Sequence, residues 1–368
     1  MNDIFVTQPS LPVLSDFIPY LEKIWKSKNL TNNGIFHTQF EEALAEYLGV
    51  KYVSLFCNGT IALLVGLRAL EIEGEVITTP FTFVATAHAI KWAKLTPVFC
   101  DIENETYNIN SDKIEPLITE KTKAIMPVHV YGNPCNIEKF DNIARKNKLK
   151  VFYDAAHAFG VKKDNYSILN CGDLSMLSFH ATKIFNTFEG GALITNNFKL
   201  KQKIDKLKNF AFENEATISG LGINGKMNEF QAALGCLQLK YIAGNIEKCK
   251  IITEFYRKQL NYVSGISFLS DMQNINHNYS YFPILVDEKK YGISRDILYK
   301  RLKEYKIMSR KYFYPLVSNL EIYKELPSAS IENLPVANKK AEQVLCLPIY
   351  PDLDIKEIER IVSIITKI

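Results

Sequence analysis

The amino-acid sequence predicts an α/β protein in which helices flank a mostly parallel β-sheet and a smaller α+β domain follows. Three observations support this fold class. Short apolar runs rich in Val, Ile, Phe and Tyr recur over about two thirds of the chain, and amphipathic stretches separate several of them. Such alternation is typical of parallel sheets covered by helices. The length of 368 residues and the hydrophobic content of 47% are sufficient for two domains.

The expected strands of the first part follow one another at short intervals. They are YVSLF (52–56), EVITT (75–79), TPVFCD (96–101), AIMPVHV (124–130), KVFYDA (150–155), LSMLSF (174–179) and GALITN (191–196). The amphipathic stretches 61–71 and 137–148 are expected to be helices between them. In a parallel sheet of this kind, ligands bind at the carboxyl ends of the strands.

The character of the sequence changes from about Gln231. Longer helical segments are expected over 232–258, and the runs ISFLS (266–270) and YSYFPILV (279–286) are expected to form antiparallel strands before further helices. We therefore expect a large domain over residues 1–245, which includes an N-terminal segment, and a small C-terminal domain over 246–368.

Composition excludes several classes of function. The formal net charge of +4 comes from 44 basic and 40 acidic residues that are scattered along the chain, which argues against a nucleic-acid or membrane surface. The start MNDIFVTQPSLPVL lacks the features of a secretory signal, and no window approaches the roughly 18 apolar residues of a membrane span. We expect a cytoplasmic protein. Seven widely spaced cysteines without a CxxC pair predict free thiols and no zinc site or other metal centre.

One strand end carries the features of an anion site. In SLFCNGTIALLVGL, Gly59 and Thr60 stand where a strand stops and an apolar helix begins. Free backbone N–H groups and the helix dipole therefore point at one spot. A plain helix cap by Asn58 or Thr60 explains the same residues.

Two further strand ends carry a carboxylate and an amine. Asp154 ends the strand of VFYDAAHAFG, and Lys183 follows the strand of LSMLSF. Each has an ordinary explanation, since Asp154 can cap a turn and Lys183 can lie in a solvated connection. As a set with the anion site they match the needs of pyridoxal phosphate. Its phosphate needs N–H donors, its pyridine nitrogen an acidic partner, and its aldehyde a lysine for the Schiff base.

The sequence also resembles the DegT/DnrJ/EryC1/StrS family of aminotransferases through nearly its whole length. The stretches that carry the resemblance are LTNNGIFHTQFEEALAEYLGVKYV, CNGTIAL, TTPFTFVATAHAI, TPVFCDIENETYNIN, TKAIMPVHVYG, YDAAHAFG, SFHATKIFNTFEGGALITN, GINGKMNEFQAALG and VLCLPIYPDL, in the family's order and spacing. The resemblance implies the aspartate-aminotransferase-like fold, known as fold type I, with pyridoxal 5'-phosphate as cofactor and transamination of nucleotide-linked keto-sugars as activity.

The resemblance assigns roles to individual residues. Lys183 would hold the cofactor covalently and, once released, move protons between cofactor and substrate carbons, while Asp154 would pair with the pyridine nitrogen. The phosphate would be held by Gly59, Thr60 and Ser178.

Three more positions match the family's cofactor site. Phe83 aligns with an aromatic residue that stacks on the pyridine ring, although it could be a core phenylalanine. His157 matches a position near the cofactor's phenolic oxygen, although it could be a packed histidine. Asn224 matches an asparagine that reaches the phosphate of the neighbouring subunit, which implies a homodimer with shared active sites. The sequence here is Asn-Gly-Lys-Met where NYRM is commoner, and the missing arginine leaves the local ion pairing open.

The segment around Lys183 bears on the substrate. Relatives that act at carbon 3 of a dTDP-keto-sugar commonly have a GKNLGALGDGG-like segment, whereas HATK followed by NTFEGG resembles enzymes that form dTDP-4-amino-4,6-dideoxyglucose. His180, Thr182 and Glu189 distinguish the two and are expected in the sugar pocket, although Glu189 could be a solvated loop residue. Another branch of the family replaces the lysine by histidine and dehydrates its substrate, which Lys183 argues against.

We therefore expect transamination of a dTDP-4-keto-6-deoxyhexose by L-glutamate, which leaves 2-oxoglutarate, in the biosynthesis of a surface polysaccharide such as lipopolysaccharide. An aminotransferase for a C3-keto or UDP-linked sugar is the alternative. A non-enzymatic regulator that binds pyridoxal phosphate is a third possibility, against which stands the lack of a basic recognition helix.

Overall fold

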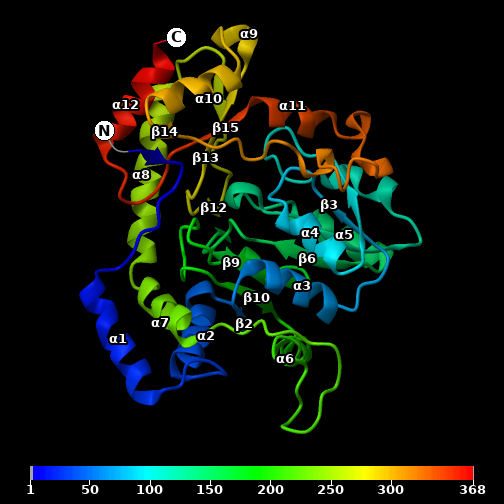
Figure 1. Ribbon diagram of the computed structural model, residues 1–368. Helices are drawn as coiled ribbons and strands as arrows, with labels where there is room; N and C mark the ends of the chain where they lie inside the picture. The colour runs from blue at the N-terminus through cyan, green and yellow to red at the C-terminus, as the bar shows by residue number, and fades with distance from the viewer. Residues whose placement is uncertain (1–2, 368) are drawn as a thin grey trace.

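The computed structural model describes residues 3–367, and a seven-stranded sheet lies at its centre (Figure 1). The strand order is β2-β10-β9-β6-β5-β3-β4. The bounds are β2 Tyr52–Phe56, β3 Glu75–Thr78, β4 Thr96–Phe99, β5 Thr122–Met126, β6 Lys150–Asp154, β9 Leu174–Ser178 and β10 Gly191–Thr195. Neighbouring strands are parallel except where β10 pairs with β2 and β9. The predicted mostly parallel sheet is confirmed.

The predicted strands overlap the observed ones, and the largest difference is at the end of β5. The run 124–130 was expected to be extended throughout, but β5 ends at Met126. Pro127 follows and has no amide hydrogen with which to continue the ladder.

Helices cover both faces of the central sheet. Their bounds are α2 Ile35–Leu48, α3 Gly59–Ala69, α4 Ala85–Trp92, α5 Ile137–Asn147, α6 Phe198–Leu207 and α7 Glu229–Gln238. Phe40 of α2 belongs to one buried cluster with Leu177 of β9, whereas Leu63 of α3 belongs to another with Met176 of the same strand. Successive side chains of a strand point to opposite faces, so the two clusters are the cores of the two faces.

A second, smaller sheet organises the C-terminal part of the chain. Strands β11 Ile266–Phe268, β13 Phe282–Val286 and β15 Val344–Leu347 pair in antiparallel fashion, as the sequence predicts for the first two. Helices α8 Ile242–Leu260, α10 Arg295–Glu304 and α12 Ile355–Thr366 surround a separate core that includes Tyr256, Ile284 and Ile361. The expected helical region 232–258 is thus two helices, α7 and α8.

The N-terminal segment joins the C-terminal part. Strand β1 (Ile4–Phe5) pairs in parallel with β14 (Ile307–Met308), and Figure 1 shows both near the C-terminal helix α12. The division at residue 245 stays a prediction, and Asn245 lies near the start of α8. The remaining α-helices and strands are α1 Leu14–Ser27, α9 Glu288–Tyr291, α11 Pro335–Gln343, β7 Lys162–Lys163, β8 Tyr166–Ser167 and β12 Ile275–Asn276. Between residues 3 and 367, the helices are too short or too polar to cross a membrane.

Candidate active site

A cavity of about 640 Å³ opens at the carboxyl ends of β2, β6 and β9. It gathers every predicted site residue except Asn224. The predicted residues that line it are Gly59, Thr60, Phe83, Asp154, His157, Ser178, His180, Thr182, Lys183 and Glu189. Strand ends that are far apart in the sequence therefore meet at one edge of the sheet, as the strand pattern predicts.

The start of helix α3 forms one end of the cavity. The Asn58 side chain caps the helix by accepting from the Ile61 amide at 2.9 Å, so the plain-cap interpretation of this turn is correct for Asn58. The amides of Gly59 and Thr60 precede the first intrahelical hydrogen bond, and both residues line the cavity. The cap and the anion site are therefore compatible, and this end fits a phosphate group.

Glycines keep this anion site open. A Cβ atom on Gly59 would lie 3.2 Å from the Cβ of Ser178 and 3.2 Å from the Met176 sulfur, so glycine lets the Ser178 hydroxyl lie beside the helix start. A Cβ atom on Gly191 would lie 2.8 Å from the Gly59 nitrogen. The first residue of β10 thus packs directly on the backbone turn that begins α3, which explains a glycine after Glu189-Gly190.

Asp154 ends β6 and is buried, with 4% of its surface exposed. Its Oδ2 accepts from the Thr86 hydroxyl at 2.7 Å and its Oδ1 from the Ala156 amide at 3.1 Å. Burial raises the pKa of the carboxyl, while these two donors and the Lys183 charge oppose the rise. The bond to Ala156 is a turn contact, yet the carboxyl also lines the cavity. A buried carboxylate in this place fits a protonated ring nitrogen.

Lys183 lies in the connection between β9 and β10, and its amine faces the cavity. Nζ donates to the Tyr281 hydroxyl oxygen at 3.1 Å. Burial lowers the pKa of the amine to about 8, and the charges of Asp154 and Tyr312 oppose this change. The interpretation of Lys183 as a solvated loop residue is therefore wrong, and its environment suits an amine that reacts in neutral form.

His157 and Phe83 differ in their surroundings. His157 is buried, and its Nδ1 accepts from the Tyr131 amide at 3.1 Å, which assigns the proton of the neutral ring to Nε2. Burial, aided by the Lys183 charge, holds its pKa well below the usual range. His157 is thus both packed and part of the cavity wall. Phe83 is 58% exposed and lines the cavity, so the core-phenylalanine interpretation is wrong.

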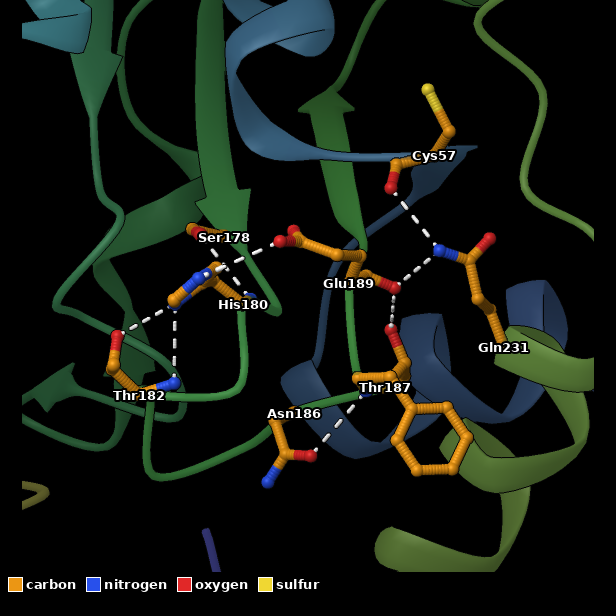
Figure 2. Close-up of polar contacts among 9 residues, drawn as sticks. Cys57, Ser178, His180, Thr182, Asn186, Thr187, Glu189 and Gln231 are labelled. Atoms are coloured by element: carbon orange, nitrogen blue, oxygen red, sulfur yellow. Dashed lines mark hydrogen bonds and ion pairs between the residues drawn. The ribbon is translucent and has the colours of Figure 1, made fainter. Parts of the chain in front are cut away.

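The three residues expected in the sugar pocket form one network (Figure 2). Nδ1 of His180 accepts from the Thr182 amide at 3.2 Å and lies 2.8 Å from the Thr182 hydroxyl, and its Nε2 lies 3.5 Å from Glu189 Oε1. Because Nδ1 accepts a hydrogen bond from the Thr182 amide, the proton of the His180 ring lies on Nε2, which faces the Glu189 carboxylate.

The Glu189 backbone is held from the other side. Its carbonyl accepts from the Gln231 side chain at 2.6 Å and from the Thr187 hydroxyl at 2.8 Å (Figure 2). The main chain is thereby fixed while the half-exposed carboxylate remains available at the cavity wall.

Asn224 lies outside the cavity. It is exposed, and it forms an isolated antiparallel backbone bridge with Asn209. The two residues thus close the base of the loop that follows α6 (Figure 1). Lys226, which stands in the position of the commoner arginine, donates to Asn209 Oδ1 at 2.7 Å and lies 5.1 Å from the centroid of the Phe210 ring. Its role is therefore to hold the base of this loop, and the role of Asn224 stays a prediction.

Sequence reasoning missed several residues of the site. Thr86, Tyr281, Tyr312 and Phe313 all line the cavity. Thr86 lies within the family-like stretch TTPFTFVATAHAI, which could have drawn attention to it. The other three come from the C-terminal part of the chain, where no strand-end pattern points to them.

Comparisons with known proteins agree with this geometry. The sequence model described as "DegT/DnrJ/EryC1/StrS aminotransferase family" matches residues 14–366. The chain is 55% identical over 371 residues to dTDP-4-amino-4,6-dideoxy-D-glucose transaminase of Escherichia coli, with 100% of this chain and 99% of that protein covered. The crystal structure of DesI with its TDP-sugar product has a TM-score of 0.95 at 32% identity, covering 100% of this chain and 93% of DesI. NtdA of Bacillus subtilis, solved with bound cofactor PMP, has a TM-score of 0.87 at 28% identity over 96% of this chain and 82% of NtdA.

Proposed function

Because this chain belongs to the DegT/DnrJ/EryC1/StrS aminotransferase family, we propose that it transfers an amino group to carbon 4 of a dTDP-linked 4-keto-6-deoxyhexose. It is a pyridoxal phosphate-dependent sugar aminotransferase. The product would be dTDP-4-amino-4,6-dideoxyglucose, the sugar in the name of its Escherichia coli relative. The observation that carries the proposal is the meeting of Lys183, Asp154 and the start of α3 in one cavity.

When bound, pyridoxal phosphate supplies an electron sink for the carbon that loses its proton. Lys183 would hold it covalently. Its amine, with a pKa lowered to about 8, has an appreciable neutral fraction near neutral pH and can accept a proton at Nζ. Asp154 would hold the proton of the ring nitrogen, and Thr86 and the Ala156 amide keep its carboxylate oriented.

The other walls would bind and orient. Gly59, Thr60 and Ser178 would hold the phosphate, Phe83 would cover one face of the ring, and the Nε2 proton of His157 would face its phenolic oxygen.

Glu189 and His180 support a place for the hexose. The Glu189 carboxylate can accept a hydrogen bond from one sugar hydroxyl, and the His180 Nε2–H beside it can donate to another sugar oxygen. L-Glutamate as amino donor, a homodimer in which Asn224 reaches the partner's phosphate, and a cytoplasmic location are further parts of the proposal.

Product analysis tests the function. The purified protein, loaded with pyridoxal phosphate, is incubated with L-glutamate and dTDP-4-keto-6-deoxyglucose, and the nucleotide sugars are separated and identified by mass spectrometry and NMR. We expect a 4-amino sugar together with 2-oxoglutarate. Parallel incubations with a 3-keto isomer and a UDP-linked 4-keto sugar should give far slower turnover. Preferred amination of either would replace the proposed substrate by that one.

A further inference from the structure

The hydroxyl of Tyr281 is the hydrogen-bond partner of the Lys183 amine, and it comes from a distant part of the chain. Nζ of Lys183 donates to Tyr281 Oη at 3.1 Å across a sequence separation of 98 residues. Tyr281 directly precedes β13, whereas Lys183 lies between β9 and β10. The C-terminal part of the chain thus supplies a group that contacts the reactive amine of the large sheet.

The Tyr281 ring is held firmly enough to act as a fixed support. Its centroid lies 4.6 Å from that of His157 and 5.6 Å from that of Tyr131. Tyr131 in turn donates its hydroxyl hydrogen to the Tyr312 carbonyl, and its ring stacks on Phe313 at 6.0 Å with an interplanar angle of 7°. A ring packed among such neighbours has little freedom, so its hydroxyl oxygen has a defined place in the cavity wall.

Three other groups interact electrostatically with the amine. Asp154 at the end of β6 and the Tyr312 hydroxyl favour its charged form, and His157, whose pKa is held low by burial, faces it as a neutral ring. The ring nitrogen of the cofactor is proposed to lie beside Asp154, and its phenolic oxygen beside His157. Neither residue is therefore free to bind the amine during turnover. The Tyr281 hydroxyl has no such task.

We propose that Tyr281 is a positioning residue that accepts a hydrogen bond from the Lys183 amine whenever that amine is not bound to the cofactor. Donation of one N–H to Tyr281 fixes the orientation of Nζ and directs its remaining positions toward the cavity, where a proton must be taken up and returned. The inference rests on the proposed function for its purpose, but the contact itself can be tested without a sugar substrate.

Labelling of Lys183 tests the contact in the full-length protein freed of cofactor. The amine is acetylated with acetic anhydride across a range of pH, and the modified peptide is quantified by mass spectrometry to give the apparent pKa of Lys183. The Tyr281→Phe change keeps the ring and removes the acceptor. Since a hydrogen bond to a charged donor stabilises the ammonium, we expect this pKa to fall by about one unit in the variant. Tyr279→Phe is the matched control, because its hydroxyl lies 3.5 Å from Asp271 and its ring does not line the cavity. It should leave the pKa of Lys183 unchanged.

Kinetics of the cofactor-loaded protein provide the second measurement. Tyr281→Phe should lower kcat about tenfold with little change in KM for the sugar, because the amine is misdirected while substrate contacts persist. If Tyr281→Phe does not fold, 4-fluorophenylalanine at position 281 keeps the ring, replaces the hydroxyl by a poor acceptor that does not ionise, and should shift the pKa in the same direction. An unchanged labelling pKa in either variant would overturn the inference, whatever sugar the enzyme uses. A failed sugar assay with a shifted pKa would reject only the proposed substrate.

Discussion

The Thr86 hydroxyl lies 2.7 Å from Oδ2 of Asp154 and connects the first turn of α4 to the end of β6. Both residues are buried, with 1% and 4% of their surface exposed. Thr86 also lies 3.2 Å from the Thr82 hydroxyl. The carboxylate that is proposed to face the ring nitrogen is therefore oriented by a short chain of hydroxyl groups.

Thr86→Val should remove a hydrogen bond to the Asp154 carboxylate while the side chain of Asp154 stays in place. Loss of a donor to a buried carboxylate raises the pKa of that carboxyl further, so the acidic limb of the pH–rate profile should move to higher pH. We expect kcat to fall about tenfold, the cost of one hydrogen bond to a charged group. Thr86→Ser restores the hydroxyl and should restore both quantities. A Thr86→Val enzyme with the wild-type profile would show that Thr86 only fills space.

Gly191→Ala should weaken cofactor binding. A Cβ atom there would lie 2.8 Å from the Gly59 nitrogen, so the turn that begins α3 must shift. We expect the affinity for pyridoxal phosphate to fall by at least about tenfold, measured by fluorescence titration of the cofactor-free protein. Gly244→Ala in α8 is the control, because an added Cβ meets nothing within 4 Å, and it should bind as wild type does. Unchanged affinity of the folded Gly191→Ala protein would contradict the proposed phosphate site.

The lowered pKa of Lys183 should make the free energy of unfolding depend on pH. Burial lowers it from 10.5 to about 8, so between these values the unfolded chain binds more protons at this residue than the folded one. The contribution of Lys183 to stability therefore improves as pH rises from about 8 to about 10.5 and is most unfavourable below pH 8. In the cofactor-free protein, Lys183→Met should be more stable than wild type at pH 7 by up to about 3 kcal/mol, with a difference that shrinks toward pH 10. Urea unfolding at several pH values measures it, and a difference independent of pH would contradict the shifted pKa.

Glu189→Gln should act on the sugar and not on the cofactor. The amide keeps the size of the side chain but loses the charge that faces His180 Nε2. We expect KM for the keto-sugar to rise about tenfold while cofactor affinity stays as in wild type. Glu215→Gln, a change of the same kind at an exposed residue, should alter neither. A wild-type KM in Glu189→Gln would show that Glu189 is a solvated loop residue that does not bind the sugar.

Subunit exchange tests the role of Asn224. If Asn224 serves the partner's site, a mixed dimer of Lys183→Ala and Asn224→Trp chains has one site with both defects and one with neither. Two nearly inactive preparations should then recover about one quarter of wild-type activity after random equimolar exchange. If exchange is demonstrated by native mass spectrometry and activity stays at the parental level, Asn224 does not complete a site across an interface.

The predictable part of the site follows from strand ends. Gly59, Asp154 and Ser178 stand where apolar strands stop, and parallel strands bring such residues to one edge, so a pattern in the sequence suffices. Tyr281 could not be found this way, because its place depends on how the C-terminal sheet packs against the connection that carries Lys183. Helices α1, α2, α4 and α6 also went unpredicted. The exposed Phe83 was predicted correctly to lie at the cavity, but only because it aligns with an aromatic residue of the family. A phenylalanine as such would have been expected in the core.

Lys183 is proposed to carry the cofactor covalently, and reduction of the loaded protein with borohydride tests this assignment. The protein is loaded with pyridoxal phosphate, reduced, digested and mapped by mass spectrometry. We expect loss of the visible absorbance band and one stable pyridoxyl label, on the peptide that contains Lys183, with no label in Lys183→Ala. A label on another lysine, or an unlabelled Lys183 in a protein that still transaminates, would contradict it.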